Sequence, residues 1–309
     1  MRILKPKFWD EKRISFYSII LLPFSFVYSF FVFIKYIFYK KKTFPFPIIC
    51  VGNVYVGGTG KTPVSIKIFE ILNKLKKKPV VVKKKYSFVN DEILLIRKYC
   101  NILSFNKRIE ALNKVVEKGF DIVILDDGYQ EFNIKKDLSI ICFNERQMIG
   151  NGQIIPAGPL RHNLKYIKYS DIILINGSKD LKFENMLKKY NSNLIFLYYK
   201  LKPYNLPENI NDEFIAFAGI GNPSNFFEDL KKIGLKVIKE ISFPDHHEYS
   251  EKKIFELIDL AKKKKAKLIT TEKDFLRINR EEQKNFIYLP VEVVFENEEL
   301  LKQNLRKFL

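Results

Sequence analysis

One stretch near residue 50 restricts the fold more than any other part of the chain. The apolar run FPIIC leads directly into VGNVYVGGTGKTP, residues 51–63, which contains four glycines. Residues 64–75, VSIKIFEILNKL, then carry apolar side chains at helical spacing. A strand, a glycine-rich loop and a helix in this order bring backbone N–H groups to a helix N-terminus, where anions bind. The sequence therefore predicts an α/β fold with a phosphate-binding loop.

This loop departs at one position from the usual phosphate-loop pattern, G-x-x-x-x-G-K-[ST]. Gly60, Lys61 and Thr62 match the pattern, whereas Tyr55 stands where the first glycine belongs. We expect Lys61 to reach the β- and γ-phosphates and Thr62 to offer its hydroxyl to Mg²⁺. A glycine-rich turn with a surface lysine is the structural alternative. The predicted nucleotide-binding residues are Tyr55, Val56, Gly57, Gly58, Thr59, Gly60, Lys61 and Thr62.

A second apolar stretch, FDIVILDDGYQ at 120–130, ends in the carboxylates of Asp126 and Asp127. Parallel strands deliver such groups to the same edge of a sheet as the phosphate loop. Both aspartates are therefore candidate metal ligands together with Thr62. Two aspartates before a glycine are also ordinary turn residues, which leaves a structural role open.

The composition limits the possible partners. The net charge is +19, from 54 basic and 35 acidic residues, which favours an anionic partner such as a nucleic acid, a membrane surface or a phosphorylated substrate. Only nine of the basic residues are arginines, and readers of nucleic acid usually depend more on arginine. Three cysteines in apolar surroundings indicate reduced core thiols.

An apolar segment near the N-terminus indicates contact with a membrane. Residues 14–34 contain no charged side chain; as a helix they would be about 31 Å long, close to the hydrocarbon thickness of a bilayer. Basic residues flank both ends, which suits a helix whose two ends meet anionic headgroups on one side. A buried core helix is the alternative. If the segment is an anchor, deletion of residues 1–38 should release the protein from membranes and leave the nucleotide site intact.

Strands and helices alternate through the rest of the chain. We expect a membrane-associated segment at 1–43, a phosphate-loop domain with a parallel sheet at 44–200 and a smaller α/β domain at 201–309. Within the second of these, residues 149–171 are rich in Gly and Pro and carry Arg161, Lys165 and Lys168. This loop is either a simple connection or a wall that binds an acidic substrate.

Six motifs in order resemble one known family, tetraacyldisaccharide 4'-kinase, a membrane-associated kinase that makes lipid IVA in lipid A biosynthesis. The motifs are the loop at 48–63, LDDGYQ at 125–130, GNGQIIPAGPLR at 150–161, AFAGIGNPSNFF at 216–227, FPDHH at 243–247 and TEKD at 271–274. The resemblance implies a P-loop NTPase-like fold and the use of ATP and Mg²⁺. It also implies a lipid substrate, tetraacyldisaccharide 1-phosphate, and a monomer on the cytoplasmic face of the inner membrane, bound to its anionic surface rather than to nucleic acid.

The resemblance also assigns the catalytic residues. The family carries a catalytic Asp in an Asp-Glu pair, here Asp91 and Glu92, and a His in Phe-x-Asp-His that assists it, here His246. We expect Asp91 to accept the proton of a sugar hydroxyl while His246 orients it. Without the resemblance, the local sequence predicts only that Asp91 belongs to the start of a helix and that His246 lies in a loop. Residues in or beside the motifs are expected to bind substrate: Asn53, Glu92, Gln130, Asn151 and Arg161.

Two departures from the family pattern place local contacts in doubt. Where the family has Ser-Arg-Gly-Tyr-Gly and a further loop, this chain has KKKYS and a shortened segment 83–90. Lys84 could replace the Arg but without its bidentate geometry. His162 replaces the Glu that usually follows the Arg of AGPLR, so a carboxylate role there is not carried over.

The sequence leaves two other classes of protein as alternatives. A membrane-tethered GTPase-like switch would need an Asn-Lys-x-Asp stretch, which neither GSKD nor TEKD supplies. A basic protein that binds nucleic acid or membrane would explain the charge but not the phosphate loop with LDDG.

Overall fold

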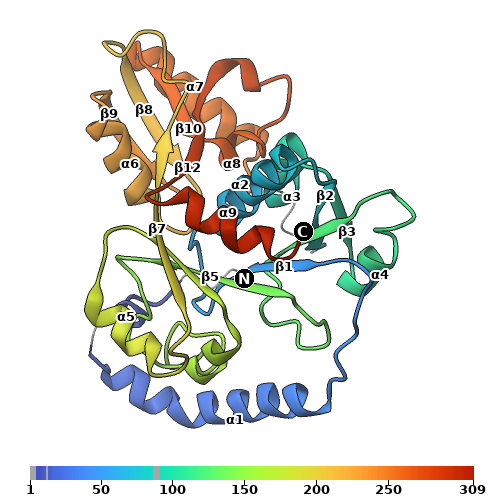
Figure 1. The fold of residues 1–309 in the computed structure, drawn as a ribbon. Coiled ribbons are helices and arrows are strands. Elements are labelled where there is room, and N and C mark those ends of the chain that lie inside the picture. Colours follow the sequence, from blue (N-terminus) through green and yellow to red (C-terminus); the bar gives the residue numbers. More distant parts are fainter. Residues whose placement is uncertain (1–4, 12, 86–90) are drawn as a thin grey trace. The chain divides into compact units, whose positions relative to one another are not determined.

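The computed structural model describes residues 5–11, 13–85 and 91–309, and the chain divides into two compact units (Figure 1). Unit 1 comprises Met1–Lys84, Cys100–Lys200 and Val293–Leu309. Unit 2 comprises Lys85–Tyr99 and Leu201–Glu292. Each unit contains its own sheet with helices packed on it, so the predicted α/β class is confirmed.

The sheet of unit 1 has the strand order β12-β7-β6-β5-β1-β4-β2-β3. Its strands are β1 (Ile48–Gly52), β2 (Pro79–Lys84), β3 (Ile102–Phe105), β4 (Ile122–Asp126), β5 (Leu138–Asn144), β6 (Ile172–Asn176), β7 (Ile195–Pro203) and β12 (Val291–Phe295). β1 pairs in parallel with both β4 and β5. The strand before the glycine loop therefore lies next to the strand that ends in Asp126, and both end at the same edge of the sheet.

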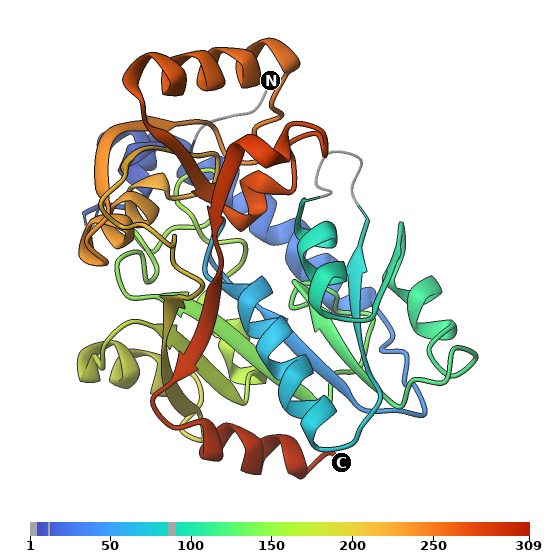
Figure 2. The same ribbon diagram turned by 90° about the horizontal axis from the view of Figure 1, so that it is seen from above.

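Helices cover both faces of this sheet, as the apolar composition of its strands requires. On one face, α2 (Lys61–Lys74) packs against β1, β2 and β4, as Figure 2 shows. The core on the other face includes side chains from α4, η2 and α5. These elements and the last helix of the unit are α4 (Arg108–Asn113), η2 (Leu164–Tyr169), α5 (Leu181–Lys188) and α9 (Glu298–Arg306).

The apolar N-terminal segment forms α1 (Phe16–Phe38), which follows the short helix η1 (Lys7–Trp9). α1 is long and apolar enough to cross a membrane by length and composition. Figure 1 shows it running along one side of unit 1. Its buried residues are Ser18 and Ser25, whereas most of its Phe and Ile side chains are exposed. The helix therefore turns polar side chains towards the protein and apolar ones outward.

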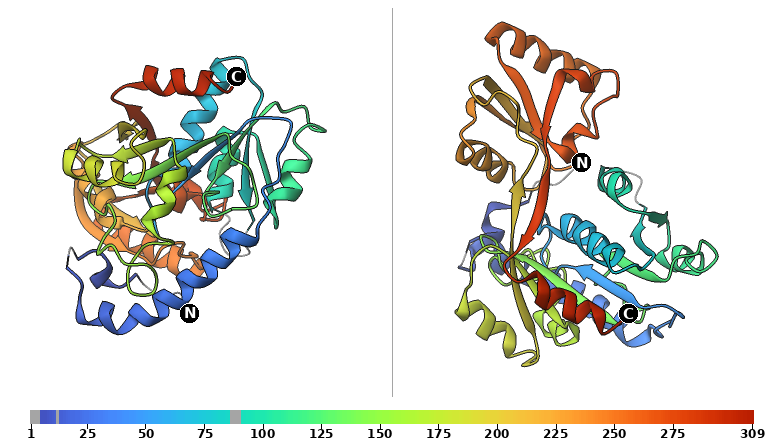
Figure 3. Two further views of the ribbon diagram at one scale, coloured as in Figure 1. Left: turned by 60° about the horizontal axis from the view of Figure 1, so that its bottom comes forward. Right: turned by 45° about the horizontal axis from the view of Figure 1, so that its top comes forward.

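Unit 2 contains a parallel sheet in the order β11-β10-β8-β9. Side chains of β8 alternate between two cores: Phe214 and Ala216 meet α6, while Ile215 and Phe217 meet α7. Figure 3 shows these two helices on opposite faces of the sheet. The elements are α3 (Asp91–Tyr99), β8 (Glu213–Ala218), α6 (Pro223–Lys232), β9 (Lys236–Ser242), α7 (Glu251–Lys264), β10 (Lys267–Thr271), α8 (Glu272–Phe275), η3 (Gln283–Asn285) and β11 (Phe286–Leu289).

The division into units differs in two places from the domains expected at 44–200 and 201–309. Residues 85–99 belong to unit 2, because α3 packs against α8. Residues 293–309 belong to unit 1, because β12 extends the sheet beside β7 and α9 buries Leu301 and Leu305. Both differences arise from contacts between segments far apart in the sequence.

The cysteines agree with their expected state. Cys50, Cys100 and Cys142 are all buried and free of disulfides. Burial raises the pKa of each thiol, so all three are inert core residues.

Candidate active site

The phosphate loop joins β1 to α2, and its conformation explains its glycines. Gly57 and Gly60 have φ angles of +121° and +81°, a region in which a side chain causes strain. The buried amide of Asn53 donates from Nδ2 to the hydroxyl of Thr59 at 3.0 Å. α2 begins at Lys61, directly after Gly60. The first backbone N–H groups of α2 are therefore available to an anion in the loop.

Tyr55, which replaces the first glycine of the usual pattern, anchors this loop. Its side chain is fully buried. Its hydroxyl donates to the carboxylate of Asp10 and accepts a hydrogen bond from Nζ of Lys5 at 2.9 Å. The next residue, Val56, donates its N–H to the carbonyl of Pro159 at 2.8 Å. The aromatic side chain thus ties the loop to the segment before α1.

Three charged side chains gather beside the loop. Nζ of Lys61 lies 3.5 Å from Oδ1 of Asp127, and Nη1 of Arg161 donates to both oxygens of that carboxylate at 2.9 and 3.1 Å. Burial opposes ionisation of Asp127, but the charges of Lys61 and Arg161 lower its pKa to about 2. Asp127 is therefore ionised at neutral pH and holds both cations in place.

Asp126 and Asp127 have different surroundings although they are neighbours. Asp126 is fully buried, its Oδ1 accepts from the hydroxyl of Ser65 at 2.8 Å, and its Oδ2 pairs with the ammonium of Lys83. The sequence predicted a role for Lys84, as the replacement for the family's Arg, but none for Lys83. The feature that could have identified Lys83 is its position near the end of β2, a strand that pairs with β4. Residues 86–90 of the shortened segment lie outside the described residues.

Two further expected residues join the group around Asp127. Nε2 of Gln130 donates to the carbonyl of Asn53 at 2.8 Å. Its Oε1 lies 3.5 Å from Nη1 of Arg161. Gln130 therefore connects the phosphate loop to the Arg161–Asp127 pair.

Two residues of the loop after β5 turn into the protein instead. Asn151 is buried, and its Nδ2 donates to the carbonyl of Ala157 at 3.0 Å, so it shapes its own loop. The ring of His162 packs against those of Tyr129 and Tyr166, with both centroids at 5.3 Å. Burial lowers the pKa of His162 to about 4. His162 is therefore a neutral aromatic packing residue where the family pattern has a carboxylate.

Asp91 and His246 are in contact within unit 2. Nδ1 of His246 lies 3.0 and 3.1 Å from the two oxygens of Asp91, and Nη2 of Arg277 donates to the same carboxylate at 2.5 Å. Asp91 is buried. Burial opposes its ionisation, but the hydrogen bond from His246 and the charges of Lys273 and Arg277 hold its pKa well below the usual range. Asp91 is thus a firmly ionised carboxylate.

The location of this pair corrects one expectation from the sequence. Asp91 was expected in the phosphate-loop domain and His246 in the other domain. Asp91 begins α3, which belongs to unit 2 together with His246. Glu92 also lies in unit 2, where its Oε1 accepts from Nζ of Lys273 at 2.7 Å. The acid–imidazole pair is therefore complete within one unit.

Sequence reasoning missed Arg277 and the role of Asp274, the last residue of TEKD. Asp274 is fully buried and accepts from the N–H of Gly219 at 3.0 Å, the hydroxyl of Tyr249 at 2.8 Å and Nη1 of Arg277 at 2.8 Å. The carbonyl of Gly219 accepts from the N–H of His246 at 3.0 Å. Asp274 thus links TEKD to Gly219 of the AFAGIGNPSNFF motif, and Gly219 in turn holds the backbone of His246. The spacing of Asp274 and Arg277, three residues apart, could have predicted their ion pair, because residues at this spacing face each other on a helical turn.

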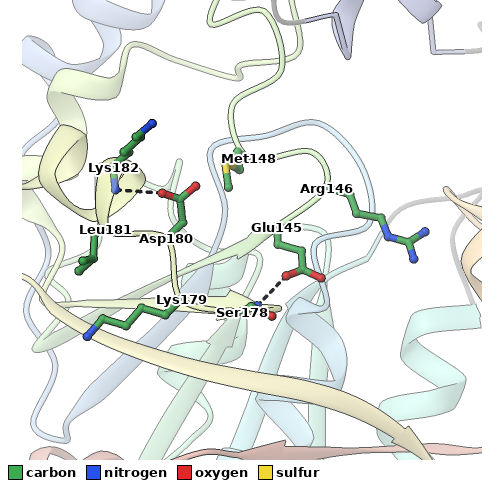
Figure 4. A pocket seen from close by; sticks show the side chains of 8 residues that line it. All are labelled: Glu145, Arg146, Met148, Ser178, Lys179, Asp180, Leu181 and Lys182. Atoms are coloured by element: carbon green, nitrogen blue, oxygen red, sulfur yellow. Dashed lines mark hydrogen bonds between the residues drawn. The ribbon is translucent and has the colours of Figure 1, made fainter.

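A depression in unit 1 lies at the ends of β5 and β6 (Figure 4) and contains none of the expected site residues. Oε2 of Glu145 accepts from the N–H of Ser178 at 2.6 Å. Oδ1 of Asp180 accepts from the N–H groups of Lys182 and Phe183 at 2.9 and 3.0 Å, which caps α5. The carboxylate of GSKD is therefore engaged in a helix cap, unlike the base-reading aspartate of a GTPase-like switch.

A phosphate loop at the end of a parallel strand, with a separate acid–imidazole pair, defines an α/β phosphotransferase. A sequence model of the family described as Tetraacyldisaccharide-1-P 4'-kinase matches residues 17–309. The chain belongs to this family, and the predicted resemblance is confirmed.

Relatives and a solved structure agree with this assignment. The chain is 40% identical over 313 residues to the Tetraacyldisaccharide 4'-kinase of Pelagibacter ubique (strain HTCC1062), with 99% of this chain and 98% of that protein covered. It is 33% identical over 324 residues to the same enzyme of Rickettsia akari (strain Hartford), with 99% and 98% covered. It also resembles crystalline LpxK from Aquifex aeolicus in complex with ATP, with a TM-score of 0.73, 26% identity, and 94% and 99% of the two chains covered.

Proposed function

We propose that this chain transfers the γ-phosphoryl group of ATP to the 4'-hydroxyl of tetraacyldisaccharide 1-phosphate, which yields lipid IVA in lipid A biosynthesis. Membership of the kinase family supports the reaction and the substrate. The observation that carries the proposal is the contact between Asp91 and His246 in a chain that also has a phosphate loop.

The phosphate loop supplies the ATP-binding half of this proposal. The backbone of residues 55–60 and the N-terminus of α2 hold the phosphate oxygens. Lys61 and Arg161 supply positive charge against the β- and γ-phosphates, where charge develops during transfer. Both cations are already positioned by Asp127, so little reorganisation is needed when ATP binds.

The described residues also fit a magnesium ion. Thr62 lies in the first turn of α2, and Asp127 is an ionised carboxylate beside Lys61; both are oxygen ligands of the kind that Mg²⁺ prefers. Asp126 fits less well, because its carboxylate is fully buried and pairs with the buried ammonium of Lys83, whereas the side chain of Asp127 is 21% exposed. We therefore assign Thr62 and Asp127 to the metal and a supporting role to Asp126. When bound, Mg²⁺ neutralises charge on the transferring phosphates.

Asp91 and His246 act on the hydroxyl group of the lipid acceptor. The 4'-oxygen forms a bond to the γ-phosphorus, the bond from that phosphorus to the bridging oxygen breaks, and ADP leaves while Asp91 accepts the hydroxyl proton. Because phosphoryl transfer has a loose transition state, the hydroxyl loses its proton late, so a carboxylate of low pKa suffices. His246 orients Asp91 through Nδ1, and Arg277 keeps it ionised.

A direct assay tests the reaction. Purified protein, ATP, Mg²⁺ and tetraacyldisaccharide 1-phosphate should give a product heavier by one phosphoryl group in mass spectrometry.

In the same assay, Asp127→Asn should raise the Mg²⁺ concentration needed for half-maximal rate, because it removes a metal ligand. Asp126→Asn should instead lower the melting temperature, because it removes the buried carboxylate charge that pairs with the ammonium of Lys83. No phosphorylated product from the folded wild-type protein would reject the proposed function.

We further propose that α1 lies in the cytoplasmic surface of the inner membrane rather than across it, on a monomeric enzyme. Its polar residues form hydrogen bonds with the loop at 150–161 of the same unit. Ser25 donates to the carbonyl of Ile154, and Tyr28 donates to that of Arg161. Most of its exposed side chains are apolar, including Phe26 and Phe33. Such a helix binds a membrane with its apolar face while the basic residues at its ends meet anionic headgroups.

Charges on the outward face of α1 should release the protein from membranes. Phe26→Asp with Phe33→Asp places two carboxylates on that face, where burial in lipid is costly, and should move most of the protein into the soluble fraction after centrifugation with anionic vesicles. Phe255→Asp is the matched control, because Phe255 is an exposed phenylalanine of α7 in unit 2. Equal sedimentation of the double variant and the wild type would show that this face does not bind lipid.

A further inference from the structure

The loop at 150–161 is bonded directly to the phosphate loop. The N–H of Val56 donates to the carbonyl of Pro159, and the N–H of Arg161 donates to the carbonyl of Val54, both at 2.8 Å. Between these bonds, Tyr55 and Leu160 form an antiparallel bridge. The backbones of the two loops are therefore joined by a short antiparallel pairing.

The other side of the same loop is bonded to α1. Oγ of Ser25 donates to the carbonyl of Ile154 at 2.8 Å and accepts from the N–H of Ala157 at 3.0 Å. The hydroxyl of Tyr28 donates to the carbonyl of Arg161 at 3.0 Å. The loop is thus held on one side by α1 and on the other by the phosphate loop.

Arg161 is the residue through which this arrangement reaches the phosphates. Its N–H is held by Val54 and its carbonyl by Tyr28, so both sides of its backbone are restrained. Its guanidinium binds Asp127, which also pairs with Lys61. A shift of α1 at Tyr28 would therefore displace the cations that surround the phosphate site.

The segment before α1 makes a second connection. Asp10 and Lys5 bond to the hydroxyl of Tyr55, which is fully buried in the phosphate loop. The same segment bonds to the loop, because Nε1 of Trp9 donates to the carbonyl of Pro156 at 3.0 Å. Both α1 and the segment before it therefore contact the loops of the nucleotide site.

We propose that the membrane helix α1 is a structural part of the ATP site, with Ser25 and Tyr28 as positioning residues that act through the loop at 150–161 on Arg161 and the phosphate loop. The inference rests on the proposed function, since it assumes that Arg161 and the loop bind ATP. It explains why a helix with an apolar surface turns its serines and a tyrosine inward. On this proposal, deletion of residues 1–38 should also weaken ATP binding, whereas the sequence alone predicted an intact nucleotide site.

The test measures ATP affinity in the full-length enzyme in detergent, so that membrane attachment does not enter. Tyr28→Phe and Ser25→Ala each remove hydrogen bonds that position the loop and should raise the Kd for a non-hydrolysable ATP analogue with Mg²⁺ about 2- to 10-fold. KM for ATP should rise in parallel, while KM for the lipid acceptor should stay unchanged. A purely structural role would lower the melting temperature without this selective change.

Two controls make the result decisive. Tyr36→Phe removes a hydroxyl from the same helix, but that hydroxyl bonds to Tyr169 rather than to the loop at 150–161, so ATP affinity should not change. Arg161→Lys should weaken ATP binding if the proposed function holds. Unchanged Kd and KM for ATP in both Tyr28→Phe and Ser25→Ala, with Arg161→Lys weakened, overturns the inference and leaves the proposed function standing. A wild-type enzyme that binds no ATP contradicts the proposed function itself.

Discussion

Lys61→Ala should reduce kcat by at least about 10²–10³-fold, and Thr62→Ala should have an effect of the same order. Lys61 supplies positive charge where it develops on the transferring phosphates, and it is held there by Asp127 at 3.5 Å. Thr62 supplies a metal-binding hydroxyl from the same helical turn. The measurement is the initial rate of formation of phosphorylated lipid at saturating ATP, Mg²⁺ and acceptor.

Lys67→Ala is the matched control for this loss. Lys67 lies further along the same helix, where its Nζ is 3.3 Å from Oε2 of Glu298. Its removal should leave kcat close to the wild-type value. Near-normal turnover in both Lys61→Ala and Thr62→Ala would mean that the glycine-rich loop is not the phosphate site.

Asp91→Ala should lower kcat by about 10²–10⁴-fold, the usual contribution of general acid–base catalysis, while ATP still binds. His246→Ala should lower kcat by a smaller or equal factor, because His246 acts on the carboxylate that it contacts at 3.0 Å. Since the two residues act as a unit, the double variant should lose little more than the more damaging single variant. The measurement is kcat and KM for all three variants at saturating ATP.

The neighbouring imidazole provides a control for the histidine. His247 stacks on Phe243 with ring centroids 4.6 Å apart, so His247→Phe keeps an aromatic ring there and should leave kcat unchanged. Fully additive losses in the Asp91→Ala and His246→Ala double variant would show that the residues act independently. A loss confined to KM would make both of them acceptor-binding groups only.

The sequence was informative where function depends on local order along the chain. The glycine loop between β1 and α2, the carboxylates at the end of β4 and the apolar α1 each follow from consecutive residues. Their backbone requirements are local: positive φ at Gly57 and Gly60, and helical spacing after Lys61. The family resemblance added Asp91 and His246, which local patterns alone describe as a helix start and a loop residue.

By itself, then, the sequence determined the fold class, the phosphate loop and the chemical type of the site residues. Only the tertiary structure decided their partners: Lys83 with Asp126, Arg277 with Asp91, and Tyr28 with Arg161. It also decided that α3 joins unit 2 and that β12 joins the sheet of unit 1. The physical reason is that a buried charge or polar group is stable only with a partner. That partner comes from whichever distant segment packs beside it, which no local pattern specifies.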